Sequence, residues 1–151
     1  MRHAEKNASK LDPDLNPRGY ARAAALVRLF PARFDTPDFV FATRASRRSN
    51  RPAETVAPLA RALHLQADLR FADEEYPFLV KDLLSDARYS EKTVLICWHH
   101  GTIPRLAAKL GVANPPSIWP DAQFDRIWKI QYDGGVATLN DLPQHLLEGD
   151  S

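Results

Sequence analysis

Two histidines and two arginines have the side chains that phosphoryl chemistry needs. Arg2 and His3 stand together at the start of the chain, and His99 follows an apolar run. Arg51 lies in a polar, arginine-rich segment. A neutral imidazole attacks phosphorus well, and a guanidinium offers phosphate oxygens a planar fork of donors. If these residues converge, they hold a phosphoryl group on several sides while one imidazole attacks it. Taken alone, Arg2-His3 has a second interpretation, a solvated tail, because chain ends are often disordered.

Two of these residues lie where an α/β fold would place ligand-binding groups. Residues 93–98 form an unbroken apolar run, which predicts a strand buried on both faces, as in a parallel sheet. His99 follows directly, and ligand groups lie just past the carboxyl ends of such strands. Arg51 stands at the expected start of a helix, where backbone N–H groups also attract an anion.

The rest of the chain alternates between helical and strand patterns. Asn16 is the expected N-cap of the first helix, with Pro17 at its first position. The expected helices cover residues 19–30, 52–63, 76–86 and 104–110. The expected strands cover residues 38–43, 67–71, 93–98, 126–132 and 136–139, the last two joined by a turn at 133–135. This alternation predicts a single α/β domain over residues 1–151.

The strand rule raises a difficulty for Arg2-His3. These residues should also follow a strand, yet the sequence has no residues before Met1 to form one. We therefore expect the first strand of the sheet to be missing or truncated.

Three blocks of the sequence resemble the histidine phosphatase superfamily, which includes cofactor-dependent phosphoglycerate mutases and bacterial phosphohistidine phosphatases. Residues 2–5 (Arg-His-Ala-Glu) resemble its Arg-His-Gly/Ala-Glu opening, and residues 51–55 (Arg-Pro-Ala-Glu-Thr) resemble its Arg-Ala-x-Gln-Thr block. Residues 94–102 resemble its apolar strand leading to a His-x-Gly-Thr turn. The order and separations of the blocks also suit the family. The resemblance, strongest to the small phosphohistidine-phosphatase-like branch, implies a phosphoglycerate mutase-like, three-layer α/β/α sandwich with a mostly parallel central sheet.

The resemblance also implies a role for each matched residue. His3 would be the nucleophile that becomes phosphohistidine, and Arg2 and Arg51 would clamp the phosphoryl oxygens. His99 would donate a hydrogen bond to the transferring group. Water would then hydrolyse the phosphohistidine, so neither a metal nor a cofactor is implied. The expected substrate is a phosphorylated small molecule or a phosphoprotein.

The second block departs from the family pattern. The family usually has Ser-Pro-x-x-Arg before it, whereas residues 47–51 read Arg-Arg-Ser-Asn-Arg. We prefer Arg51 as the clamp because it stands at the family's distance from Glu54-Thr55, and we expect Arg44, Arg47 and Arg48 to be solvated or to make secondary contacts.

The general acid is not fixed by a motif. The mutase-type acid motif is absent, and Asp73 and Glu74 are the nearest candidates for the acid. The alternative is that residues 73–75 are only a run of solvated charges without a catalytic role. His100 occupies the x position of His-x-Gly-Thr and is expected to be only a neighbour of the site. We expect no metal at His99-His100, because no Cys or Asp stands at ligand spacing.

Composition limits the remaining function classes. The net charge is +1, which argues against nucleic acid and acidic membranes as partners. The single cysteine, Cys97, rules out an internal disulfide and suggests a reducing, cytoplasmic setting. No apolar stretch approaches the roughly 20 residues of a membrane span. The sequence does not indicate an oligomeric state.

Two functions from different classes remain open. The first is a phosphatase acting through phospho-His3. The second is a phosphate-binding module, or a degenerate homologue without turnover, in which the truncated start leaves His3 without rigid support.

Overall fold

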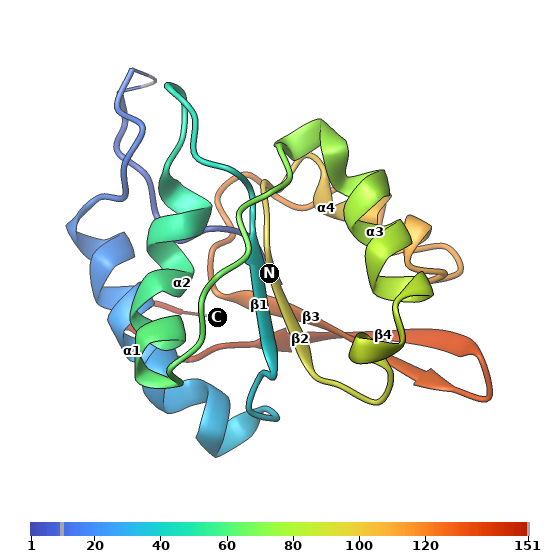
Figure 1. The fold of residues 1–151 in the computed structure, drawn as a ribbon. Helices are drawn as coiled ribbons and strands as arrows, with labels where there is room; N and C mark the ends of the chain where they lie inside the picture. The colour runs from blue at the N-terminus through green and yellow to red at the C-terminus, as the bar shows by residue number, and fades with distance from the viewer. Residues whose placement is uncertain (10, 151) are drawn as a thin grey trace.

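A parallel pair of strands lies between two layers of helices (Figure 1). The computed structural model describes residues 1–9 and 11–150. The helices are α1 (Pro17–Arg33), α2 (Arg51–Ala62), α3 (Tyr76–Ser85) and α4 (Ile103–Lys109), with short 3-10 turns at Asp73–Glu75 and Ala87–Tyr89. The strands are β1 (Phe39–Ala42), β2 (Val94–Cys97), β3 (Arg126–Asp133) and β4 (Val136–Pro143).

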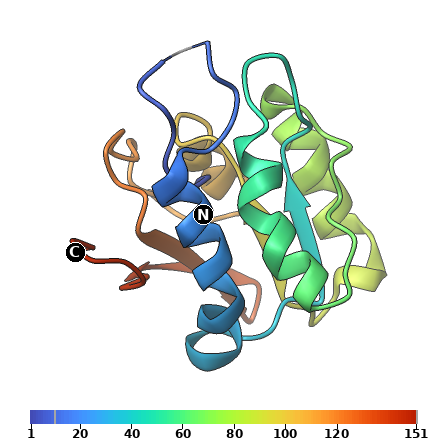
Figure 2. The same ribbon diagram turned by 90° about the vertical axis from the view of Figure 1, so that its left-hand side faces the viewer.

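The two faces of the parallel pair bury different helices. On one face, Leu26 of α1 and Val56 of α2 share a core cluster with Val40 of β1. On the other face, Leu79 of α3 and Leu106 of α4 pack in a cluster with Phe41. Figure 2 shows α1 and α2 side by side, with β1 next to α2. The predicted α/β/α layering is therefore confirmed.

The first helix begins where its sequence predicts. The Asn16 side chain accepts a hydrogen bond from the Gly19 backbone nitrogen at 2.8 Å. Pro17 occupies the first helical position, where a backbone N–H would have no acceptor within the helix. Gly19 lies so close to the Glu5 backbone that a Cβ would collide with it. Within residues 1–9 and 11–150, no helix is long and apolar enough to cross a membrane.

The predicted C-terminal hairpin is present as a separate antiparallel pair, β3–β4. Its two-residue turn consists of Gly134 and Gly135, with φ of 55° and 83°. Positive φ at both positions is the geometry of the turn that matches strand twist, and glycine adopts it freely. β4 continues to Pro143, beyond the predicted end at residue 139.

The prediction of an edge strand over residues 67–71 is wrong. The segment lies beside β1, but only Asp68 pairs with it, through a parallel bridge to Phe41. The Asp68 carboxylate accepts a hydrogen bond from the Arg70 backbone nitrogen at 2.9 Å. This local bond takes the Arg70 donor away from a strand ladder, and the next contact, from the Arg44 nitrogen to the Phe71 carbonyl at 2.7 Å, is one residue out of step, so no regular strand forms.

Residues 1–3 pair with the end of β2, so the segment that carries His3 belongs to the parallel sheet. The Trp98 nitrogen donates to the Met1 carbonyl at 3.0 Å, and the His3 nitrogen donates to the Trp98 carbonyl at 3.1 Å. The Met1 nitrogen donates to the Ile96 carbonyl at 2.9 Å. These bonds form a parallel bridge between Arg2 and Trp98, so His3 is supported by the end of β2.

Candidate active site

His3 and His99 meet at the carboxyl ends of neighbouring strand segments. Because Arg2 pairs with Trp98, the next residue on each segment lies at the same edge of the sheet. The two imidazole centroids are 5.4 Å apart, and their planes are inclined by 69°. Thr43, which follows β1, places its hydroxyl 3.4 Å from His99 Nε2. The expected convergence of the two histidines is thus present.

The hydrogen bond of His3 defines its tautomer. His3 Nδ1 lies 2.7 Å from the Ala4 carbonyl oxygen, which can only accept. The proton therefore resides on Nδ1, and Nε2 keeps its lone pair. Burial and the nearby Arg2 charge together lower the pKa of His3 to about 2, against the opposing effect of the Ala4 bond. The imidazole is therefore neutral at neutral pH, with the Nε2 lone pair free.

His99 is also neutral at that pH. Burial, followed by the positive charge of Arg51, lowers the pKa of His99 to about 4. Two uncharged imidazoles therefore share a site with cationic arginines.

Arg2 is completely buried, and only one of its guanidinium nitrogens makes hydrogen bonds within the protein, although Nη2 lies 3.8 Å from the Asp121 carboxylate. Its Nη1 donates to the carbonyls of Pro120, Asp121 and Gln123 at 3.2, 2.7 and 3.3 Å. The Phe124 ring centroid lies 3.9 Å from its Cζ. Nε and Nη2 are buried without a hydrogen-bond partner. Burial lowers the pKa of Arg2 to about 10, so it still carries its charge at neutral pH.

Arg51 is the first residue of α2, and it too has an unpaired donor. Its Nη1 donates to the Asp12 carbonyl at 3.2 Å, while its buried Nε has no hydrogen-bond partner. One turn later, the Thr55 hydroxyl donates to the Arg51 carbonyl at 2.7 Å and accepts from the Ala4 nitrogen at 2.9 Å. Thr55 therefore fixes the segment that carries His3 to the helix that carries Arg51.

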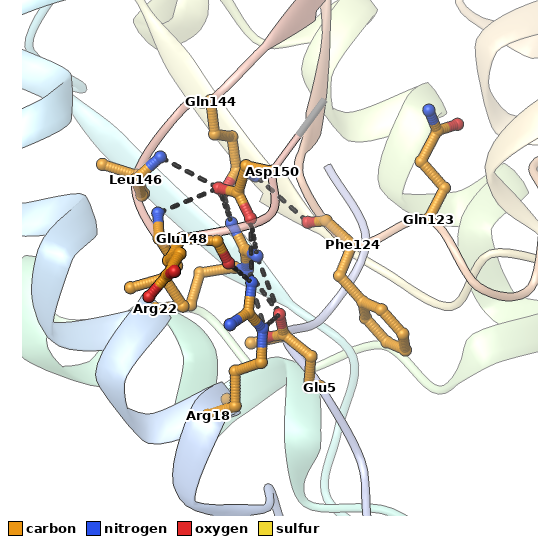
Figure 3. Close-up of polar contacts among 12 residues, drawn as sticks. Glu5, Arg18, Arg22, Gln123, Phe124, Gln144, Leu146, Glu148 and Asp150 are labelled. Atoms are coloured by element: carbon orange, nitrogen blue, oxygen red, sulfur yellow. Dashed lines mark hydrogen bonds and ion pairs between the residues drawn. The ribbon is translucent and has the colours of Figure 1, made fainter.

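An ion-pair cluster supports the other side of the same segment (Figure 3). Arg22, with a side chain only 2% exposed, donates through Nη2 to Glu5 at 2.7 Å and to Asp150 at 2.7 Å. Asp150 also accepts from the backbone nitrogens of Leu146 and Leu147. The bonds to Arg22 and to these nitrogens lower the pKa of Asp150 against the effect of its burial. The cluster joins the residues after His3 to α1 and to the C-terminal segment.

The two candidate acids lie in different environments. The Glu74 side chain is 72% exposed and pairs with Arg105 at 3.3 Å. Asp73 is half-buried, and its Oδ1 has no hydrogen-bond partner. Burial raises the pKa of Asp73, although Thr102 opposes the shift. A carboxyl with a raised pKa keeps its proton to a higher pH, so Asp73 stays a candidate acid.

The other residues singled out from the sequence are His100, a neighbour of Arg2 through Asp121, and the arginines of residues 44–48. His100 Nε2 is 3.3 Å from the Asp121 carboxylate. The arginines of residues 44–48 are exposed, as expected. Among the described residues, no three His, Cys, Asp or Glu side chains are grouped so that they could hold a metal ion.

Sequence reasoning missed three residues that contact the site. Thr43 could have been found, because it ends the predicted strand 38–43 and obeys the same strand-end rule as His99. Lys6, whose Nζ lies 3.3 Å from the Asp121 carboxylate, adds a further positive charge near His99. Phe124, which covers Arg2 and lies 6.2 Å from the His3 ring, is in a loop with no sequence signal.

Solved phosphatase structures share this fold. The protein histidine phosphatase SixA in complex with tungstate aligns with a TM-score of 0.69 at 18% identity, over 95% of this chain and 94% of its own. A protein assigned as the phosphohistidine phosphatase SixA from Agrobacterium tumefaciens aligns with a TM-score of 0.60 at 21% identity, over 94% of both chains. A mycobacterial glucosyl-3-phosphoglycerate phosphatase with inorganic phosphate gives 0.57 at 13% identity, over 92% of both chains. No protein-family model and no curated protein matches the sequence. The chain therefore has the phosphoglycerate mutase-like fold of histidine phosphatases.

Proposed function

We propose that the protein is a metal-independent phosphatase that hydrolyses a phosphomonoester or a phosphoprotein through phosphohistidine on His3. One observation carries the proposal: buried guanidinium donors of Arg2 and Arg51 lack hydrogen-bond partners beside two neutral imidazoles, and the nearest carboxylate, that of the exposed Asp121, is 3.8 Å from Arg2 Nη2. Buried donors are normally paired, so this arrangement favours an anion as the absent acceptor. Nε and Nη2 lie on one edge of the Arg2 guanidinium and match two oxygens of a phosphoryl group.

The first chemical step uses the lone pair of His3. Nε2 forms a bond to phosphorus while the bond from phosphorus to the leaving oxygen breaks, and Nδ1–H stays bonded to the Ala4 carbonyl. The hydrogen bond to Ala4 stabilises the positive charge that develops on the ring. Asp73 is the proposed donor of the proton to the leaving oxygen. Water then attacks phosphorus while its proton passes to the Asp73 carboxylate, and the bond from phosphorus to Nε2 breaks, which releases inorganic phosphate and restores neutral His3 and protonated Asp73.

The two arginines and His99 stabilise the transferring group. Charge develops on the phosphoryl oxygens in the transition state, and fixed cations in a dry site stabilise it strongly. Losing one clamp arginine costs about 2–4 kcal/mol of transition-state stabilisation, by analogy with the loss of an oxyanion-hole donor.

Three observations support a phosphorylated substrate and a cytoplasmic location. The similar structures include one named as a protein histidine phosphatase, which favours a phosphorylated protein or small molecule. A net charge of +1 argues against nucleic acid. The single, buried Cys97 suits a reducing cytoplasm.

Hydrolysis of an aryl phosphate tests the proposal. We expect turnover by the unchanged chain and a loss of about 10³-fold or more in His3→Asn, because the nucleophile is removed. His64→Asn is the matched control, since His64 is exposed and its φ of 55° suits asparagine. Binding of phosphate without turnover at any pH would instead identify a non-catalytic phosphate-binding module.

A further inference from the structure

The arginine-rich segment, which the proposed mechanism leaves unused, begins and ends at the active site. Thr43, just before it, places its hydroxyl 3.4 Å from His99 Nε2, and Arg51, just after it, supplies one of the unpaired donors. The loop between them, residues 44–50, therefore leaves the rim of the pocket and returns to it. Figure 1 shows this loop projecting beyond the carboxyl end of β1.

The tip of this loop is a tight turn that carries two adjacent arginines. The Ser46 nitrogen donates to the Ser49 carbonyl at 3.0 Å, and the Ser49 nitrogen donates back to the Ser46 carbonyl at 3.2 Å. The Ser46 hydroxyl also accepts from the Arg48 nitrogen at 3.2 Å. Arg47 and Arg48 are the two residues that these bonds enclose, and both are exposed. We call these two residues the arginine turn.

The base of the loop is held on both sides, which fixes the place of the arginine turn beside the pocket. Asn50 donates through its backbone nitrogen to the Pro13 carbonyl and through its side chain to the Asp14 carboxylate, both at 2.8 Å. On the other side, Arg44 donates to the Arg70 carbonyl at 2.9 Å. Figure 2 shows the loop next to the segment that precedes α1.

The charge of the arginine turn is not neutralised by a neighbour. Arg44, the third arginine of the loop, pairs with Glu75 at 3.3 Å. Within residues 1–9 and 11–150, by contrast, neither Arg47 nor Arg48 has an ion-pair partner. The net charge of the whole chain is only +1, so these two positive charges are a local excess at the mouth of the pocket.

The position of the arginine turn fits a polypeptide substrate. Arg47 and Arg48 each lie within four residues of Thr43 or Arg51, so their backbone is at most about 14 Å from one of these site residues. A polypeptide held by one phosphorylated residue covers that distance in about two to four residues. Guanidinium groups bind carboxylates through two parallel hydrogen bonds, so acidic side chains match the turn. Nucleic acid is a poorer match, because residues 44–50 include no aromatic side chain on which a base could stack.

We propose that the arginine turn binds acidic side chains about two to four residues from the phosphorylated residue, so that the preferred substrate is an acidic phosphorylated polypeptide. The inference rests on the proposed function, whose phosphate pocket holds the phosphorylated residue. The turn contacts the flanking residues and not the phosphoryl group, so it lowers KM and speeds association without changing the chemical step. Small phosphate esters do not reach it.

The experiment compares three peptides with a central phosphotyrosine, flanked on both sides by Glu, by Gln or by Lys. At low ionic strength, we expect kcat/KM of the unchanged chain to be about fivefold higher for the Glu peptide than for the Gln peptide, and lowest for the Lys peptide. Arg47→Glu/Arg48→Glu should reverse this order and keep kcat/KM for a small aryl phosphate within about twofold. In about 0.5 M NaCl the differences should shrink, because salt screens exposed charges.

Arg28→Glu/Arg61→Glu is the matched control. Both arginines are exposed and lie in the C-terminal halves of α1 and α2, whereas α2 meets the pocket at its N-terminal residue, Arg51. The control changes the net charge by the same amount as the test variant, so it should keep the preference for the Glu peptide.

Several results would overturn the proposal. Equal kcat/KM for the three peptides, or a Glu preference that survives in Arg47→Glu/Arg48→Glu, would show that the turn does not bind acidic flanks. An equal loss with the small aryl phosphate would show that the turn acts on the phosphoryl group instead. Tighter binding of a 5′-phosphorylated oligonucleotide than of the Glu peptide would assign the turn to nucleic acid.

A binding measurement separates this inference from the phosphatase proposal. Fluorescence anisotropy with His3→Asn gives the affinities for the three peptides and needs no turnover. Tightest binding of the Glu peptide, lost when Arg47→Glu/Arg48→Glu is added, would support the role of the arginine turn even if no peptide were hydrolysed by the unchanged chain. Equal affinities beside normal hydrolysis would overturn the role of the turn and leave the phosphatase proposal intact.

Discussion

Acid should destabilise the protein through its buried histidines. In the unfolded chain a histidine has a pKa of about 6.5, whereas burial in the folded protein lowers the pKa of His3 to about 2. Below pH 6.5 the unfolded state therefore binds a proton that the folded state excludes. The stability linked to this group is complete above pH 6.5 and is lost progressively as the pH falls toward 2.

The size of the effect follows from the two pKa values. Each pH unit below 6.5 lowers the free energy of unfolding by about 1.36 kcal/mol for a histidine that stays neutral in the folded protein. At pH 5 this histidine has therefore lowered the free energy of unfolding by about 2 kcal/mol relative to pH 7.5. His99, with a folded pKa of about 4, adds a similar loss over the same range. The two together lower the unfolding free energy by about 4 kcal/mol.

Urea denaturation at pH 7.5 and pH 5 measures this loss. In His3→Asn, the titrating group is absent, so the decrease between the two pH values should be smaller by about 2 kcal/mol. His64→Asn, at an exposed position, should keep the full decrease. An unchanged decrease in His3→Asn, with the same m-value, would show that His3 is not buried in its neutral form.

Three further substitutions test the supports of the site. Thr55→Val removes the hydroxyl that accepts from Ala4, and steady-state kinetics should show kcat lowered by about tenfold with KM little changed. Asp150→Asn breaks a buried ion pair with Arg22, and urea denaturation should show a loss of about 3 kcal/mol, whereas an unaffected midpoint would contradict the cluster. Gly19→Ala inserts a Cβ against the Glu5 backbone and should cost about 1–3 kcal/mol by thermal unfolding.

Local sequence signals predicted most of the helices, strands and strand-end residues. Asn16 and Pro17 specify the start of α1 by a local cap, and the apolar run before His99 specifies β2 without reference to distant residues. The same strand-end rule located His99 and could have located Thr43. These features depend on neighbours in the chain, so a pattern in the sequence is sufficient to find them.

Contacts between distant segments were beyond the sequence. Arg22 meets Asp150 across 128 positions, and Arg2 is held by the carbonyls of a loop more than 115 positions away. Backbone carbonyls leave no signature in residue type, so the loop that orients Arg2 could not be identified. The predicted edge strand failed at Asp68 for a related reason, because one side-chain hydrogen bond outweighed a weak strand pattern.

Trapping the covalent intermediate tests the central claim most directly. The protein is mixed with an aryl phosphate, quenched in alkali, in which phosphohistidine survives, and digested for mass spectrometry. We predict the added mass of one phosphoryl group on the peptide that contains His3, with fragmentation placing it on that imidazole, and none in His3→Asn. Phosphate on His99 or on any other side chain, or continued turnover by His3→Asn, would contradict the assignment of His3 as the nucleophile.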